Sequence, residues 1–188
     1  MHKYIILFLA LLTLSCVTQH DIIQPDNFYQ GTKKIHLVDN KGGKYFIGTV
    51  TFSNKAEKIH YQMDIEHQIF KDYFLSMKEM KCLEGPELWC HLAYPYSSPR
   101  NITTTDFSWL SHDLLFMYKK ASQFGANFYQ GIYYNFKLSS DKLIGTAMAV
   151  DLNLLAAPPQ NITLPPITAH DIDELEPANR WLPIIEIK

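Results

Sequence analysis

Apolar and polar residues alternate along much of the chain with the two-residue period of β-strands. The clearest example is residues 58–66, KIHYQMDIE. Its apolar side chains fall on one face: Ile59, Tyr61, Met63 and Ile65. Polar side chains occupy the other face, as expected for a strand that buries one side. The pattern therefore predicts a strand here.

Turn sequences separate further pairs of predicted strands. Segments 33–39 and 44–53 flank NKGG, and segments 128–138 and 142–151 flank SSDK. Gly, Asn and Asp in such short connections favour β-hairpins. Both pairs are therefore predicted to be hairpins.

The remaining strands are predicted from weaker patterns. Segments 74–82 and 87–94 bracket the turn sequence EGPE. The C-terminal segment, WLPIIEIK, ends in a short β-compatible run. Pro183 has no amide hydrogen, so this last strand would lie at a sheet edge or begin after the proline.

Two helices are predicted from a shared capping pattern, I-T-x-x-D-[F/I]-x-x-L, at residues 102–110 and 167–175. A threonine would accept a hydrogen bond from the first helical turn, and an aspartate three residues later would return one. The pairs are Thr103 with Asp106 and Thr168 with Asp171. The first helix would extend to about Ala121 along an apolar stripe, and the second would end before Pro177.

Together these elements predict a single β-rich domain of the α+β class over residues 32–188. About eight mostly antiparallel strands would form a barrel or a sandwich, with one long helix and one short C-terminal helix. Residues 1–15 are predicted to be a signal peptide, and residues 16–31 a tether that leads into the domain.

The first sixteen residues, MHKYIILFLALLTLSC, have the parts of an export signal. Lys3 supplies a positive start, residues 4–14 form an apolar run, and the small residue Ser15 precedes Cys16. The run is shorter than the roughly 20 residues that a membrane-spanning helix needs. The chain is therefore predicted to be exported.

Cys16 is the predicted lipidation site. Its position after a small residue is similar to bacterial lipoprotein signals, in which the cysteine becomes the acylated first residue. Thr13 stands where that pattern prefers Leu. A lipid anchor would hold the protein in the cell envelope, on the periplasmic side of a bacterial membrane. Cleavage by an ordinary signal peptidase would instead yield a soluble periplasmic or secreted protein.

Composition indicates a folded domain without a nucleic-acid partner. The chain has 188 residues, is 47% hydrophobic and carries a formal net charge of -2 at pH 7. That apolar content suffices for a buried core. No run of Lys or Arg provides the basic surface that nucleic acid requires.

The three cysteines predict one disulfide. If Cys16 carries lipid, Cys82 and Cys90 remain to pair across the EGPE turn. A disulfide is the expected state in an oxidising compartment. The alternative, a metal site of Cys82, Cys90 and His91, matches no zinc spacing.

No metal site or cofactor is predicted. His60, Asp64 and His67 would share a face only on a helix, whereas on the predicted strand His67 points away from the other two. Residues 170–176 are rich in acidic side chains but lack the spacing and glycine of a calcium loop.

Tyr94, Tyr96 and Tyr133 are candidates for stacking on a ligand such as a sugar ring. Their alternative role is core packing, because tyrosine favours strands and buries a large area. No catalytic residue is predicted, since no nucleophile motif is present. Residues 111–113, SHD, are consecutive, and their side chains would point in different directions.

Residues 81–96, KCLEGPELWCHLAYPY, with LNLLAAPP at 152–159 and WLP at 181–183, carry a family resemblance. The chain resembles a family of uncharacterised exported proteins of Gram-negative bacteria that are proposed to be lipoproteins. This resemblance implies no activity and no functional residues.

Three functions fit these observations. The first is a non-enzymatic module that binds a ligand or an envelope partner, either protein or glycan. The second is a carbohydrate-active or other hydrolytic enzyme with dispersed acidic residues. The third is a structural envelope protein. Paired carboxylates beside Tyr and Trp in one cleft would favour the enzyme, and an apolar cavity would favour ligand binding.

Overall fold

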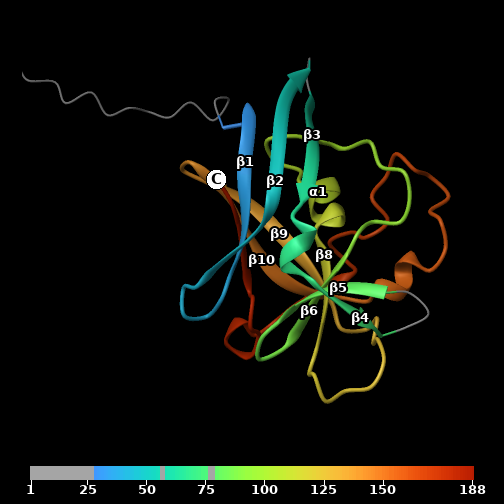
Figure 1. Cartoon of the computed structure of the whole chain (residues 1–188). Helices are drawn as coiled ribbons and strands as arrows, with labels where there is room; N and C mark the ends of the chain where they lie inside the picture. Colours follow the sequence, from blue (N-terminus) through green and yellow to red (C-terminus); the bar gives the residue numbers. More distant parts are fainter. Residues whose placement is uncertain (1–27, 56–57, 76–78) are drawn as a thin grey trace, which may run out of the picture.

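The computed structural model describes residues 28–55, 58–75 and 79–188. Within these ranges, twelve strands form one antiparallel sheet in the order β4-β5-β6-β8-β9-β10-β12-β1-β2-β3-β7, with β11 beside β10 (Figure 1). The strands are β1 (Gly31–Val38), β2 (Lys44–Lys55), β3 (Lys58–Ile65), β4 (Lys71–Phe74), β5 (Glu79–Glu84), β6 (Leu88–Leu92), β7 (Asn101–Ile102), β8 (Leu115–Lys119), β9 (Gly131–Ser139), β10 (Lys142–Val150), β11 (Ile172–Glu174) and β12 (Ile184–Ile187).

Helical structure is short throughout the described residues. The α-helix is α1 (Ser108–Asp113), and the 3-10 helices are η2 (His67–Ile69), η3 (Leu152–Leu155) and η4 (Pro177–Asn179). No helix in the described ranges is long and apolar enough to cross a membrane.

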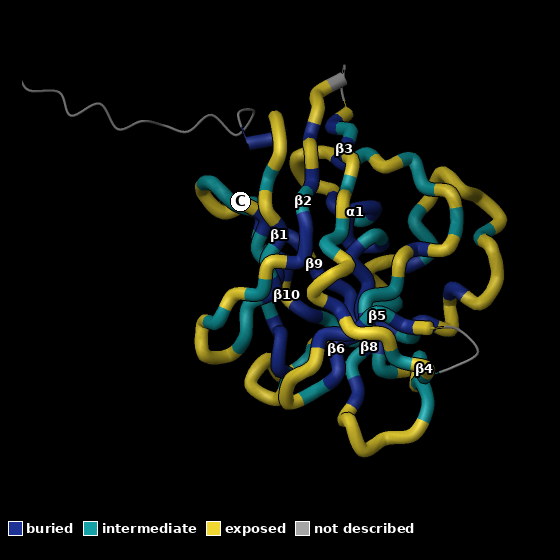
Figure 2. Tube along the Cα trace, viewed as in Figure 1, coloured by how far each residue is buried: buried dark blue, intermediate teal, exposed yellow. Residues whose placement is uncertain are grey.

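The sheet twists strongly, so that β1, β2 and β3 lie at one end of the molecule and β4, β5 and β6 at the other (Figure 1). Helix α1 packs against β7 and β9. Buried residues follow the middle strands and α1, whereas the connecting loops are exposed (Figure 2).

A chain of hydrogen bonds pairs the buried polar groups of Trp89 and Tyr134 in the core. The Trp89 indole N–H donates to the Tyr134 hydroxyl at 3.2 Å, and that hydroxyl donates to the Leu182 carbonyl at 2.8 Å. Because burial without a partner would cost free energy, this chain of bonds lets large amphipathic rings fill the core. It also links β6, β9 and the residues just before β12.

The predicted hairpins and the strand over residues 58–66 are confirmed. β1 pairs with β2, β9 with β10, and β5 with β6, each antiparallel. In β3, Ile59 and Tyr61 are buried as the alternation predicted. The segment 74–82 contains a break that was not predicted, because β4 ends at Phe74 and β5 begins at Glu79.

The C-terminal strand begins after Pro183, as predicted. It nevertheless lies inside the sheet, between β10 and β1. Ile185 and Ile187 are fully buried there, and their partners in β1 are Leu37 and Ile35. Proline at the residue before a strand therefore leaves the strand's own ladder intact.

The fold class is corrected from α+β to mostly β, because the predicted long helix is wrong. α1 covers only Ser108–Asp113, and the chain then forms β8. Residues 114–117 are all buried, so strand and helix stripes cannot be separated in this stretch. The Asp106 carboxylate accepts from the Ser108 amide at 2.9 Å and closes a turn before α1.

The predicted C-terminal helix is also wrong. The Asp171 carboxylate accepts from the Thr168 amide at 2.8 Å and from its hydroxyl at 2.6 Å, as the pattern anticipated. These bonds close a turn, after which Ile172–Glu174 pairs with β10 as β11. Pairing with β10 gives the backbone amides and carbonyls of these residues hydrogen-bond partners, as a helix would otherwise have done.

Gly48 forms a bulge in β2 that no other residue type fits. The register between β1 and β2 shifts at this point, and the Gly48 φ angle is 149°. A Cβ atom here would lie 2.2 Å from the Asp64 carbonyl oxygen of β3. The bulge also lets the Ile47 carbonyl accept from the Glu66 amide at 2.9 Å.

We expect Gly48→Ala to lower the free energy of unfolding by about 2 to 5 kcal/mol, since it combines an unfavourable φ with overpacking. Gly42→Ala is the matched control. Gly42 also has a positive φ, but open space surrounds its Cβ position. Its cost should be about 1 to 2 kcal/mol. Equal losses for the two variants in chemical denaturation would contradict the proposed clash.

Candidate ligand-binding groove

An apolar groove of about 530 Å³ lies between the β5–β6 hairpin and the segment that follows β10. Its apolar lining residues are Met80, Leu92, Ala93, Pro95, Phe128, Leu152, Leu155 and Ala156. Its polar lining residues are His67, Glu79, Lys81, His91 and Asn153. The size and the mostly apolar lining are typical of a small-molecule site.

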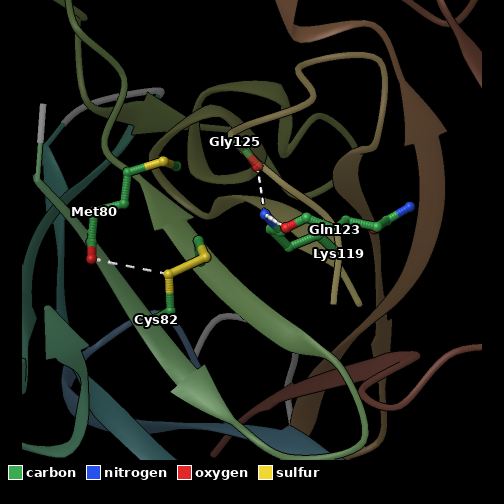
Figure 3. The surroundings of a disulfide bond; sticks show 6 residues. Met80, Cys82, Lys119, Gln123 and Gly125 are labelled. Carbon is green, nitrogen blue, oxygen red and sulfur yellow. Dashed lines mark hydrogen bonds between the residues drawn. A yellow bond between two sulfur atoms is a disulfide. The ribbon is translucent and has the colours of Figure 1, made fainter. Parts of the chain in front are cut away.

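The sheet wall of the groove is cross-linked by the disulfide Cys82–Cys90 (Figure 3). The two cysteines are directly opposed in β5 and β6, and the adjacent pair, Lys81 and His91, lines the groove. The predicted disulfide is confirmed. Because both sulfur atoms are bonded to each other, they are not available to ligate a metal with His91.

Lys119 organises the loop that leads to the groove. Its side chain is buried, and its ammonium group donates to the carbonyl oxygens of Gln123 and Gly125 (Figure 3). Burial lowers the pKa of Lys119. The loop is also tied to the end of β4, because the Ala126 amide donates to the Leu75 carbonyl at 2.7 Å. These bonds position the segment that carries Phe128.

The opposite wall is built from η3 and the loop before β9. The Leu152 amide donates to the Phe128 carbonyl at 2.9 Å, and the Tyr96 hydroxyl donates to the Leu155 carbonyl at 2.8 Å. Gly131 permits this packing, since a Cβ atom there would lie 2.5 Å from Leu152 Cγ. Backbone hydrogen bonds and close packing therefore hold this wall in place.

His91 is the largely enclosed polar residue of the groove. Its Nε2 lies 3.1 Å from the Asp113 carbonyl oxygen. Since a carbonyl can only accept, Nε2 carries the proton. The ring packs beside Phe116 and Phe70, with centroid distances of 5.2 and 6.4 Å. Burial lowers the pKa of His91, which favours the neutral ring.

The tyrosines predicted for ligand stacking gather beside the groove, in an aromatic cluster around His112. Tyr94 and Tyr133 pack edge-on against His112, with centroid distances of 5.5 and 5.7 Å. They are only 9% and 7% exposed, so protein rings cover them. Tyr96 is half-buried and contacts Tyr94 and the groove wall. Ligand stacking stays a prediction.

His112 is a buried structural residue of α1. Its Nδ1 donates to the Ser108 carbonyl at 2.7 Å, and its Nε2 accepts from the Ile167 amide at 3.1 Å. Both ring nitrogens are therefore satisfied in the neutral form, and burial lowers the pKa of His112. The neighbouring Ser111 hydroxyl donates to the Tyr134 carbonyl at 2.7 Å. Consecutive residues of α1 thus reach different partners.

Asp113 joins β3 to the end of α1. The Tyr61 hydroxyl donates to Asp113 Oδ2 at 2.9 Å, and Arg100 Nε lies 3.7 Å from the same oxygen. Burial raises the pKa of the Asp113 carboxyl, an effect that the Tyr61 hydrogen bond and the Arg100 charge oppose. Sequence patterns missed this cluster, because its members come from separate strands and loops.

The histidine and acidic residues considered for metal binding do not converge. His60 and Asp64 lie on β3, whereas His67 lies in η2 and lines the groove. In the acidic C-terminal stretch, Asp171 bonds to Thr168. Over residues 28–55, 58–75 and 79–188, no group of three or more His, Cys, Asp or Glu side chains is placed to hold a metal ion.

A second, more polar pocket of about 420 Å³ lies beside the turn between β1 and β2. Arg180 Nη1 donates to Glu87 Oε1 at 2.6 Å, and the Trp181 amide donates to Glu87 Oε2 at 2.9 Å. Asp39 accepts from the Tyr45 hydroxyl at 3.1 Å. Because these polar groups are paired within the protein, the apolar groove is the stronger candidate site.

The predicted lipidation site, Cys16, and the signal peptide lie outside the described residues. The described part begins with Phe28 and Tyr29, which are already buried in the core beside Phe52.

No protein-family model, curated protein or solved structure matches this chain. The function is therefore inferred from the chemistry of the groove itself.

Removing the disulfide with Cys82→Ala and Cys90→Ala should lower the free energy of unfolding by about 2 to 3 kcal/mol, because the unfolded chain gains freedom. Denaturation with and without a reductant provides the measurement. The reductant should destabilise the wild type and leave the double variant unchanged. If the wild type and the double variant have equal stability without reductant, the cross-link contributes nothing to the free energy of unfolding.

Two buried histidines, His91 and His112, should make the stability fall as the pH drops below about 6.5. Burial lowers the pKa of His91 and His112, so the unfolded chain binds protons that the native protein does not. The loss begins near the unfolded value of about 6.5 and continues down to the native pKa of each ring. Urea denaturation at pH 7 and pH 5 measures this slope.

His112→Gln should reduce the change in the free energy of unfolding between pH 7 and pH 5. Ser111→Ala is the control, because it removes a buried hydrogen bond from the same helix without removing a titrating group. It should destabilise the protein equally at both pH values. If His112→Gln and the wild type lose the same free energy on acidification, His112 does not contribute to the pH dependence.

Proposed function

We propose that this chain is an exported, non-enzymatic binding module that takes a small apolar molecule in the apolar groove. The groove itself is the observation that carries the proposal. Its volume of about 530 Å³ lies within the range of about 300 to 1,000 Å³ typical of small-molecule sites. Eight of its lining residues are apolar, so burial of an apolar ligand would provide the binding free energy.

Preorganisation of both walls supports this role. The disulfide Cys82–Cys90 holds the β5–β6 hairpin, and hydrogen bonds from Lys119 and Leu152 hold the loop and η3. A ligand that enters a preformed groove loses less free energy to ordering the protein. The buried disulfide therefore has a role in binding as well as in stability.

Export and a membrane anchor are part of the same proposal. Residues 1–15 have the pattern of an export signal, and a structural disulfide suits the oxidising compartment to which such a signal leads. Acylation of Cys16 would then hold the binding module at the periplasmic face of a bacterial membrane. An apolar ligand would be available there from the adjacent lipid phase.

The hydrolytic alternative lacks a supporting observation at the groove. Glycoside hydrolysis usually uses a pair of carboxylates. Among the described residues, the groove lining includes Glu79 and no second carboxylate. Tyr94 and Tyr133, which could have formed a sugar platform, are packed into the cluster around His112. The binding role is therefore favoured.

Titration with the fluorescent apolar probe N-phenyl-1-naphthylamine tests the proposal. The wild type should bind the probe saturably with one site. Ala93→Trp and Ala156→Trp should each weaken binding by about tenfold or more, because either ring would fill part of the groove. Both alanines line the groove and are exposed, so the larger side chain is compatible with folding.

Ala178→Trp is the matched control, because Ala178 is also exposed but lines the polar pocket. It should bind the probe like the wild type. Absence of saturable binding to the wild type, or unchanged affinity in both groove variants, would refute the assignment of the groove as the ligand site.

A further inference from the structure

His91 gives the sheet wall of the groove a specific polar group. The imidazole Nε2 is already used, because it donates to the Asp113 carbonyl at 3.1 Å. In the neutral ring, the other nitrogen, Nδ1, is then an acceptor with a free lone pair. The orientation of this acceptor is fixed by the backbone of α1 rather than by a flexible side chain.

Nδ1 is free to interact with a ligand. Within the described residues, it has no hydrogen-bond partner, and it is absent from the set of fully buried unpaired atoms. That set consists of Tyr29 Oη, Tyr94 Oη and Gln130 Oε1. His91 lines the groove, so the unused acceptor belongs to a residue that a molecule in the groove would contact.

The donors nearest to the groove have other partners. Lys81 forms an ion pair with Asp72, its neighbour on β4. The Asn153 side-chain amide donates to Asp151 Oδ1 at 2.8 Å. His67 and Glu79 are exposed at the rim. The enclosed part of the groove therefore combines apolar surface with one unused acceptor.

We propose that the groove selects apolar molecules that carry a hydrogen-bond donor, a hydroxyl or an amide N–H, which binds to Nδ1 of His91. This inference rests on the proposed function, because it names the ligand class for the same groove. A long-chain alcohol is the simplest member of the class. An ionised fatty acid has only acceptors in its head group and would leave Nδ1 unpaired.

Competition between the fluorescent probe and two isomers measures this selectivity. Decan-1-ol and 1-methoxynonane have the same atoms, but only the alcohol has a donor. The measured quantity is the affinity for the alcohol divided by the affinity for the ether. We expect this ratio to be about 3- to 10-fold larger in the wild type than in His91→Phe, as for the loss of one neutral hydrogen bond. Taking the ratio across the two proteins cancels the difference in hydrophobicity between the isomers.

Two further variants separate recognition from folding. His91→Gln should keep most of the alcohol preference, because an amide can donate to the Asp113 carbonyl and still offer an acceptor. His170→Phe should keep the full preference, because His170 is exposed and does not line the groove. Loss of the preference in His170→Phe would show that the preference is not specific to His91 and would overturn the proposal.

The outcomes distinguish this inference from the proposed function. If the probe does not bind the wild type, the binding role itself fails. If the probe binds but the alcohol-to-ether ratio is equal in the wild type and His91→Phe, the groove stands and the donor selection is wrong. Decanoate provides a third arm at pH 8. If it binds more tightly than decan-1-ol, charge pairing selects the ligand and the inference fails.

Discussion

Pairing of backbone amides and carbonyls in one continuous antiparallel sheet is the constraint on which the rest of the structure depends. A buried backbone group must have a partner, and twelve strands share that requirement across the described residues. Because of this constraint, residues 115–119 and 172–174, which were predicted to be helical, form strands that pair with a neighbouring strand of the sheet. It also brings β12 between β1 and β10, far from both in sequence. Backbone pairing in the sheet therefore decides the structure of these segments more strongly than the local helix-capping patterns do.

The groove is a consequence of the same sheet. The β5–β6 hairpin supplies one wall, and the segment after β10 returns over it as η3. The disulfide sits one residue pair away from Lys81 and His91, so the cross-link and the lining belong to one rigid element. His91 in turn is held by the carbonyl of Asp113, whose carboxylate is bound by Tyr61 of β3. The polar group of the groove is thus positioned from both ends of the sheet.

Local patterns were sufficient for much of the fold. The hairpin turns, the alternation in β3 and the start of β12 after Pro183 are all short-range features, and the structure contains them. The long helix was a wrong prediction because residues 114–117 are buried on every side, which removes the periodicity that separates helix from strand. The acceptor role of His91 was not predicted at all. It depends on a carbonyl 22 residues away and on the return of η3 across the hairpin.

By itself, the sequence determined the β-rich character, the three hairpins and the cysteine pair, because each depends on neighbours within a few residues. It also carries the export pattern, which is a property of composition and order alone. Only the tertiary structure decided the strand order, the burial of Tyr94 and Tyr133 around His112, and the groove with the unused acceptor of His91. These features arise from contacts between distant segments. Their free energies depend on burial and on the dielectric surroundings, which no local pattern specifies.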